Sequence, residues 1–307
     1  MSEAIQVRGL VKTYGPLRAV DGIEFQVNRG EVFSFLGPNG AGKTTTVEVL
    51  EGLRRATEGS VRVLGMDPWE EGRALHRRIG VIPQGFKFFD KVTPREAIRY
   101  YAALFGTRAD PDLLLKRVLL SDKAQDTFDK LSGGQRQKLG LALALVSDPE
   151  VLFLDEPTTG LDPQARRAIW DVIRELRTEG RTVFLTTHYL DEAEELADRV
   201  AILHHGRIIT EGTPRDLIQR HGSPPRLLIT GPREVARTLK AHTDLEVQED
   251  HGETHVILHR PGDLSRAVQT LETHGVRWED LSTERDSLED VFIRLVGEMD
   301  EGEITSS

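Results

Sequence analysis

The sequence contains no cysteine among its 307 residues. Disulfide bonds and cysteine-ligated metal sites are therefore excluded, and the absence fits a protein of the reducing cytoplasm. Long apolar runs are also missing, because the longest, Leu139–Val146, is far shorter than the ~18 residues that span a bilayer. The first residues lack the basic start and apolar block of a signal peptide. We therefore expect a cytoplasmic protein.

An excess of positive charge is absent as well. The chain has 40 basic and 50 acidic residues and a net charge of −10. Proteins that bind nucleic acid usually carry a basic excess or a basic stripe, so we expect no nucleic-acid partner. The hydrophobic share of 38% and the charged share of 29% are ordinary for a soluble protein, and the length suits about two domains.

The first two thirds of the chain alternate between strand-like and helix-like segments. Several of the strand-like segments are wholly apolar, which is typical of strands buried on both faces of a mostly parallel sheet. Helices between them predict a doubly wound α/β domain over residues 1–221. The expected strands are Ile5–Val7, Val32–Leu36, Ser60–Val63, Ile79–Ile82, Val151–Leu154, Thr182–Thr186 and Arg199–Leu203.

One block of this domain lacks strand-like segments. From Thr93 to Val146 the pattern is helical, and it begins with a helix start in which Thr93 is the N-cap, Pro94 the first helical residue and Glu96 the partner in a capping box. We therefore predict a helical insertion over about residues 88–146.

The composition changes at Gly222-Ser223-Pro224-Pro225, which is typical of a linker. The segments that follow predict the order βαββαβ, which is that of a small α+β ferredoxin-like domain over residues 222–307. A last amphipathic helix over Ser287–Val296 and an acidic, polar tail complete this expected domain.

A glycine-rich segment between the strand Val32–Leu36 and a following helix matches the phosphate-binding loop of P-loop NTPases. Its glycines allow backbone N–H groups to point inward, and the helix N-terminus favours an anion. Lys43 would bridge the β- and γ-phosphates of a nucleotide, and the Thr44 hydroxyl would bind Mg²⁺. The alternative is a simple turn that joins strand to helix. The residues of the loop and the one after it are Gly37, Pro38, Asn39, Gly40, Ala41, Gly42, Lys43, Thr44 and Thr45.

Two acids, Asp155 and Glu156, end the buried strand Val151–Leu154. Ligands of open α/β sheets bind beyond the carboxyl ends of the strands, where the phosphate loop also lies. Asp155 is then the expected Mg²⁺ partner, directly or through water. Because successive strand residues point to opposite sides, Glu156 would instead face an attacking water as general base.

A second anion cradle is predicted at Ser132-Gly133-Gly134-Gln135, where small residues open a helix. Two cradles for one nucleotide suggest that they belong to different subunits. The stretch Leu131–Gln135 resembles the signature of ABC-type ATPases, the nucleotide-binding subunits of ABC transporters. In that family the signature of one subunit covers ATP on the phosphate loop of another, so the resemblance implies an ATP-driven homodimer.

The resemblance extends over Ile5–Thr213 and implies roles for four further residues. Tyr14 would stack on adenine, unless it is only an apolar residue of an edge hairpin. Gln84 would contact Mg²⁺ and water, and His188 would contact the γ-phosphate and position the attacking water. Asp162 would cross the dimer, although Asp162-Pro163 equally fits a helix N-cap.

The resemblance further implies ATP hydrolysis with Mg²⁺, catalysed by Lys43, Glu156 and His188. It implies separate transmembrane subunits as partners and a place on the cytoplasmic face of the membrane. An exporter of drugs, lipids or polysaccharide is the subtype that the sequence resembles most; an importer subunit or a soluble ABC ATPase is the alternative. The stretches that carry the subtype are GPNGAGKTTT, LDEPTTGLDP, TTHYLDEAEELADRVAILHHGRI and DSLEDVFIRLVG.

Aromatic residues cluster shortly after Gln84. They fit either a groove for a helix of the membrane subunit or the internal packing of the helical block. These residues are Phe86, Phe88, Phe89, Tyr100 and Tyr101.

Overall fold

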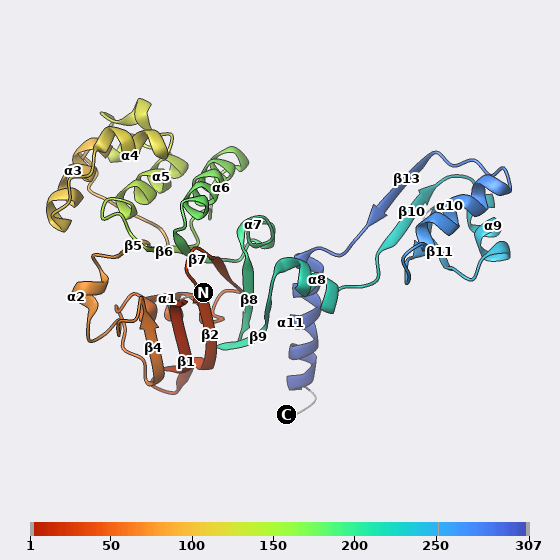
Figure 1. Ribbon diagram of the computed structural model, residues 1–307, viewed down its shortest axis with the longest axis horizontal. Coiled ribbons are helices and arrows are strands. Elements are labelled where there is room, and N and C mark those ends of the chain that lie inside the picture. Colours follow the sequence, from red (N-terminus) through yellow and green to blue (C-terminus); the bar gives the residue numbers. More distant parts are fainter. Residues whose placement is uncertain (1–2, 251, 305–307) are drawn as a thin grey trace. The chain divides into compact units, whose positions relative to one another are not determined.

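The computed structural model describes residues 3–250 and 252–304, which form two compact units (Figure 1). The first unit ends at Pro214 and the second begins at Arg215, whereas the sequence places the boundary at residue 221. Helix α8 (Pro214–His221) accounts for the difference, because the Arg294 guanidinium of the second unit donates to the carbonyl of His221. The end of the expected acidic tail, residues 305–307, lies outside the described residues.

The centre of the first unit is a six-stranded sheet that is parallel except for its last strand, β9. Its neighbouring strands β5, β6, β7 and β3 place their carboxyl ends at one edge. Every residue of β3, β6 and β7 is buried, as the apolar sequences predict. In sheet order the strands are β5 (Ile79–Ile82), β6 (Val151–Asp155), β7 (Thr182–Thr187), β3 (Val32–Leu36), β8 (Arg199–His204) and β9 (Arg207–Gly212).

A second, antiparallel sheet in the same unit is larger than the sequence predicts. It consists of β2 (Leu17–Asn28), β1 (Glu3–Tyr14) and β4 (Glu58–Val63). The sequence did not predict β2 of this sheet, nor β9 of the six-stranded sheet. The β1–β2 ladder contains several register shifts, and Gly9 and Gly22 have positive φ angles of 57° and 68°. Such bulges interrupt the alternation of apolar and polar residues by which strands are predicted.

Helices cover the parallel sheet, and the block from α3 to α5 contains no strand, which confirms the predicted insertion (Figure 1). The Thr93–Glu96 capping box is present, with the Glu96 N–H donating to the Thr93 hydroxyl at 3.3 Å and the Thr93 N–H to the Glu96 carboxylate at 2.9 Å. The helices are α1 (Lys43–Leu50), α2 (Gly72–Leu75), α3 (Pro94–Phe105), α4 (Pro111–Arg117), α5 (Gly133–Ala144), α6 (Pro163–Thr178) and α7 (Leu190–Leu196), with 3₁₀ turns at Ser121–Lys123 and Phe128–Lys130.

The second unit has the βαββαβ order, with its four antiparallel strands arranged β11-β12-β10-β13. The first strand of the motif thus lies between the third and the fourth, which is the ferredoxin-like arrangement. Helices α9 and α10 pack on a core that includes Leu227, Ile229 and Val256. Its elements are β10 (Arg226–Thr230), α9 (Glu234–His242), β11 (Glu246–Asp250), β12 (Glu253–Ile257), α10 (Asp263–Thr273), β13 (Asp280–Glu284) and α11 (Leu288–Ile304).

Helix α11 continues past Val296, where the sequence predicts its end. Among the described residues no helix is both long enough and apolar enough to cross a bilayer.

The two faces of β10 provide a test of the second unit's core. Leu227 is fully buried and Leu228 is only half-buried, because neighbouring strand residues point to opposite faces. We expect Leu227→Ala to lower the free energy of unfolding of this unit by about 2–5 kcal/mol and Leu228→Ala by clearly less. Urea unfolding of the two variants, followed by circular dichroism, measures the difference, and equal losses would contradict the assigned faces.

Candidate nucleotide site

The loop between β3 and α1 approaches its surroundings more closely than a side chain would permit. A Cβ at Gly37 would lie 2.4 Å from the Leu203 carbonyl oxygen, and one at Gly42 would lie 2.6 Å from that of Ala19. Gly42 also has a φ of 103° in the left-handed region, which favours glycine. The predicted phosphate loop therefore needs both glycines for the position of its backbone.

Lys43, the first residue of α1, is almost fully buried. Its ammonium donates to the carbonyls of Gly37 at 2.7 Å and Pro38 at 3.1 Å, and it lies 3.7 Å from Glu156 Oε1. Burial lowers the pKa of Lys43, and the charges of Glu156 and Asp155 oppose that change. A buried ammonium with three donors at the mouth of a phosphate loop suits a polyphosphate.

Asp155 lies buried at the end of β6, where oxygen atoms gather. Both the Thr44 hydroxyl, 3.5 Å away, and the Thr186 hydroxyl donate to its Oδ1. Burial raises the pKa of Asp155, while these two hydroxyls favour the ionised form. A carboxylate and a hydroxyl beside a phosphate loop are the hard oxygen donors that Mg²⁺ prefers. The residues therefore fit this metal, which takes its other ligands from phosphate and water.

Glu156 has an unusual backbone conformation, with a φ of 49° in the left-handed region. Its N–H donates to the carbonyl and to the hydroxyl of Thr186, each at 3.1 Å. A non-glycine residue in this region is strained and persists where its surroundings hold it. The two neighbouring acids have different hydrogen-bond partners, since Asp155 accepts from Thr44 and Thr186 whereas Glu156 accepts from Gln84 and Thr159.

The Glu156 carboxylate is surrounded by four polar side chains. It accepts a hydrogen bond from the Gln84 amide at 2.9 Å and one from the Thr159 hydroxyl at 3.2 Å. His188 Nδ1 lies 3.3 Å from its Oε2, opposite the contact with Lys43. Gln84, Glu156 and His188 follow the adjacent parallel strands β5, β6 and β7, and therefore meet at one edge of the sheet.

Gln84 was predicted to contact the metal, and the structure places its amide nitrogen against Glu156 rather than Asp155. Among the described residues no group of three or more His, Cys, Asp or Glu side chains is arranged to hold a metal ion. A Mg²⁺ site made of one carboxylate, one hydroxyl and substrate phosphates does not need such a group.

The predicted second cradle is built as a capped helix start. The Gln135 N–H donates to the Ser132 hydroxyl at 3.3 Å, and the Ser132 N–H donates to the Gln135 amide oxygen at 2.9 Å. Among the described residues, none of the side-chain hydrogen bonds of these two reaches the phosphate loop. A Cβ at Gly134 would lie 2.8 Å from that of Ala165, so this glycine lets α5 approach α6, whereas Gly133 has no such close neighbour.

Two expected binding residues lie in ordinary structural positions. Asp162 is the N-cap of α6, since its carboxylate accepts from the N–H groups of Gln164 at 3.0 Å and Ala165 at 2.9 Å. Tyr14 ends β1, and the cations of Lys12 and Arg54 lie 5.1 and 5.3 Å from the centre of its ring. Tyr14 thus lies in a hairpin and Asp162 caps a helix, which are the alternative interpretations of these two residues.

The aromatic residues after Gln84 divide into two groups. Phe86, Phe88 and Tyr101 pack against the core of the helical block. Phe89 and Tyr100 are 67% and 56% exposed, so they form a surface instead. Internal packing therefore applies to the first three residues, and the groove for a membrane subunit's helix stays a prediction for the two exposed ones.

Three residues of the site were missed by sequence reasoning. Thr186 and Thr159 hold the two acids, but single threonines give no sequence signal. Glu51, directly after α1, is almost fully buried, and burial, reinforced by the charge of Asp155, raises its pKa to about 8. The position of an acid between apolar neighbours, Val49-Leu50 and Leu53, is the only signal that the sequence offers for Glu51.

The chain is similar in sequence to known proteins of one family. A family model described as ABC transporter matches residues 20–159. The chain is 40% identical to the daunorubicin resistance ATP-binding protein DrrA3 of Streptomyces coeruleorubidus, over 96% of each chain. It is 39% identical to the Nod factor export ATP-binding protein I of Rhizobium sp. (strain N33), over 96% of this chain and 97% of that one. The chain belongs to the ABC transporter ATP-binding proteins.

Solved structures of ABC proteins share the fold. An ATP-binding subunit of an ABC transporter superposes with a TM-score of 0.64 at 28% identity, covering 71% of this chain and 92% of that one. A dimeric bacterial ABC transporter cassette superposes with a TM-score of 0.61 at 26% identity, covering 68% and 98%. The predicted P-loop α/β core and the ATPase activity of an ABC subunit are thereby confirmed.

The raised pKa of Glu51 predicts a dependence of this ABC protein's stability on pH. Because the folded state holds the proton more tightly than the unfolded state, the stabilisation is complete below the ordinary pKa of 4.5 and is lost as the pH rises through about 8. We expect the free energy of unfolding to fall by up to about 1.4 kcal/mol per pH unit in that window, and by less in Glu51→Gln. Urea titrations without nucleotide or metal measure the slopes. The exposed Glu58→Gln is the control, and an unchanged slope in Glu51→Gln would contradict the assignment.

The two glycines of the signature predict different effects of the same substitution. Gly134→Ala must push α5 from α6, and we expect a loss of about 1–3 kcal/mol of stability. Gly133→Ala, whose nearest neighbour would be the Leu161 side chain at 4.0 Å, is the matched control and should not destabilise the fold. Thermal unfolding of both variants tests this, and equal melting temperatures would refute the close approach.

Proposed function

We propose that this chain is the ATP-hydrolysing subunit of an ABC exporter and drives separate membrane subunits. The observation that carries the proposal is the buried contact of Lys43 with Glu156 at the edge where Gln84 and His188 also lie. One cation, one acid, one amide and one imidazole around a phosphate loop suit in-line attack of water on a terminal phosphate.

The nucleotide's phosphates would bind along the loop Gly37–Thr45, where α1 begins, to the backbone N–H groups that all of its residues except Pro38 carry. Tyr14 would stack on the adenine. Thr44, Asp155 and Gln84 would hold Mg²⁺, which, when bound, offsets the negative charge of the phosphate oxygens. The support for this set is the hydrogen bond of 3.5 Å from the Thr44 hydroxyl to the Asp155 carboxylate, which places two oxygen donors side by side.

Glu156 would accept the proton of the attacking water as the general base. The left-handed turn and the Gln84 and Thr159 hydrogen bonds hold its carboxylate in one place, so little reorganisation is needed during reaction. His188 would contact the γ-phosphate and keep the water aligned, and Lys43 would stabilise the charge that spreads over the phosphate oxygens.

The subunit would work as an ATP-driven homodimer, in which Ser132, Gly133, Gly134 and Gln135 of one protomer cover the nucleotide of the other. The support for this arrangement comes from the start of α5. The side chains of Ser132 and Gln135 each accept from the other's backbone N–H, and this cap does not use the N–H groups of Gly133 and Gly134 at the start of α5, which would receive a phosphate. Asp162 would combine its observed cap with a contact across the dimer.

Export is favoured over the importer and the non-transport alternatives by the relatives, which are named for daunorubicin resistance and Nod factor export and which this chain matches over nearly its whole length. The cargo would be a drug, a lipid or a polysaccharide. The exposed Phe89 and Tyr100 suit a membrane subunit's cytoplasmic helix, so the chain would lie on the cytoplasmic face of the membrane.

Glu156→Gln tests the proposal directly. Because glutamine keeps the size of the side chain but is a far weaker base, we expect ATP turnover to fall about 100-fold or more while ATP binding persists. Trapped ATP should also produce a stable dimer in sedimentation experiments with Mg²⁺. The exposed Glu24→Gln serves as the control and should behave as the wild type.

Unchanged turnover in Glu156→Gln would contradict its role as the base. A variant that binds ATP without hydrolysis and stays monomeric, even with the membrane subunit present, would contradict the shared site. Gly133→Ala tests whether the signature acts in the shared nucleotide site or only in the packing of the fold. A Cβ at Gly133 would leave the fold unstrained, so this variant should lower only the ATP turnover of the dimer.

A further inference from the structure

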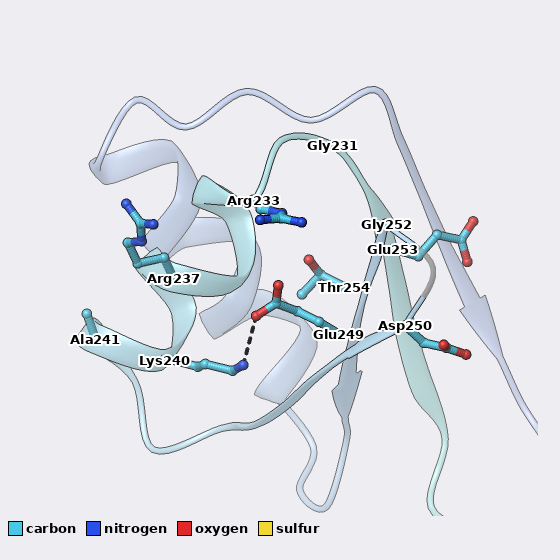
Figure 2. Close-up of a pocket in the computed structure, with 10 residues that line it drawn as sticks. All are labelled: Gly231, Arg233, Arg237, Lys240, Ala241, Glu249, Asp250, Gly252, Glu253 and Thr254. Carbon is cyan, nitrogen blue, oxygen red and sulfur yellow. Dashed lines mark hydrogen bonds and ion pairs between the residues drawn. The ribbon is translucent and has the colours of Figure 1, made fainter.

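A cleft of about 800 Å³ opens in the second unit, between α9 and the β11–β12 hairpin (Figure 2). The nucleotide site lies in the first unit, so this cleft belongs to neither the phosphate loop nor its acids. Its volume is within the range of small-molecule sites, about 300–1,000 Å³. The side chains of Arg233, Lys240, Glu249 and Thr254 line it and face its interior (Figure 2).

The positive charges of the cleft come from one helix. Arg233 and Lys240 extend from α9 toward the strands, and Lys240 forms an ion pair with Glu249 at 2.9 Å (Figure 2). The neighbouring cations lower the pKa of Glu249, through Lys240 first and then through Arg233 and Arg237. Glu249 is therefore an ionised carboxylate that already has its partner in Lys240.

The Arg233 guanidinium, by contrast, takes part in no hydrogen bond or ion pair among the residues that the structure describes. Figure 2 shows it above Thr254, a buried residue of β12, whose hydroxyl also faces the cleft. The hydroxyl of Thr254 makes no hydrogen bond within the described part of the chain. A forked donor and the hydroxyl of a buried residue thus face the same space.

The other acids near the cleft do not supply the missing partner. Figure 2 shows the carboxylates of Asp250 and Glu253 directed away from α9, on the far side of the hairpin. Glu253 contacts the Thr230 hydroxyl at 3.5 Å and His255 Nε2 at 3.8 Å. The described residues that line the cleft thus include three cations and three carboxylates, and Lys240, paired with Glu249, and Arg233 are the cations that extend toward the strands.

We propose that this cleft binds a small phosphorylated molecule, with the phosphate held between the Arg233 guanidinium and the Thr254 hydroxyl. The planar fork of arginine matches two oxygens of a phosphate, and Lys240 adds charge from a position two turns further along α9. Soluble phosphate monoesters and phosphate-bearing lipid head groups share this chemistry. The ferredoxin-like unit is then a ligand-binding domain attached to the ATPase.

Calorimetric titration of the full chain with glycerol 3-phosphate tests the proposal. Saturating Mg²⁺-ADP is present throughout, so that the phosphate loop is filled. We expect saturable binding that weakens at least tenfold in Arg233→Gln and several-fold in Thr254→Val, whose side chain has the same shape without the hydroxyl. Arg277→Gln is the control, because this arginine of the same unit is exposed and is not among the described residues that line the cleft, and the variant should bind within twofold of the wild type.

Circular dichroism of each variant ensures that lost binding is not lost folding. A second arm uses sedimentation with vesicles of phosphatidylcholine, with or without phosphatidic acid. Binding to the acidic vesicles that depends on Arg233 identifies a lipid head group as the ligand, and binding of glycerol 3-phosphate alone identifies a soluble one. The proposal is overturned if neither probe binds saturably, or if Arg233→Gln and Arg277→Gln weaken binding equally.

Discussion

The opposed charges of Lys43 and Glu156, buried 3.7 Å apart, constrain the rest of the first unit. A charge taken out of water is costly unless a partner and hydrogen bonds compensate it, and removal of one member of such a pair costs about 3–5 kcal/mol. The fold supplies that compensation from several directions. The carbonyls of the phosphate loop accept from the ammonium, while Gln84 and Thr159 donate to the carboxylate.

Parallel strands make this convergence possible. Because β3, β5, β6 and β7 run in the same direction, the residues that follow them reach a common edge although they lie far apart in the chain. The left-handed turn at Glu156 then separates two neighbouring carboxylates into different surroundings, one with hydroxyls and one with an amide, an imidazole and an ammonium. A single strand end thus holds the two carboxylates that we propose as metal ligand and as base.

The helical block and the second unit extend this machinery in different ways. Gly134 brings α5 against α6, so the start of α5 packs beside Ala165 of α6 and Leu161 of the loop before it. The second unit has its own core and its own charged cleft, both formed by elements outside the ATPase fold. A ligand of that cleft would act on a domain that is built independently of the nucleotide site.

Much of this protein follows from the sequence alone. The phosphate loop, the acids after β6, the helical insertion and the βαββαβ order are local patterns, in which each residue's neighbours in the chain determine its conformation. The bulged β1–β2 hairpin, the strand β9 and the end of α11 were not predicted, because register shifts and packing obscure the periodicity on which such predictions depend. Only the tertiary structure decided that Glu51 is buried near Asp155, that Thr186 and Thr159 hold the two acids and that Arg233 faces Thr254. The reason is physical: burial and hydrogen bonding of a polar side chain depend on residues that the chain brings together from distant positions.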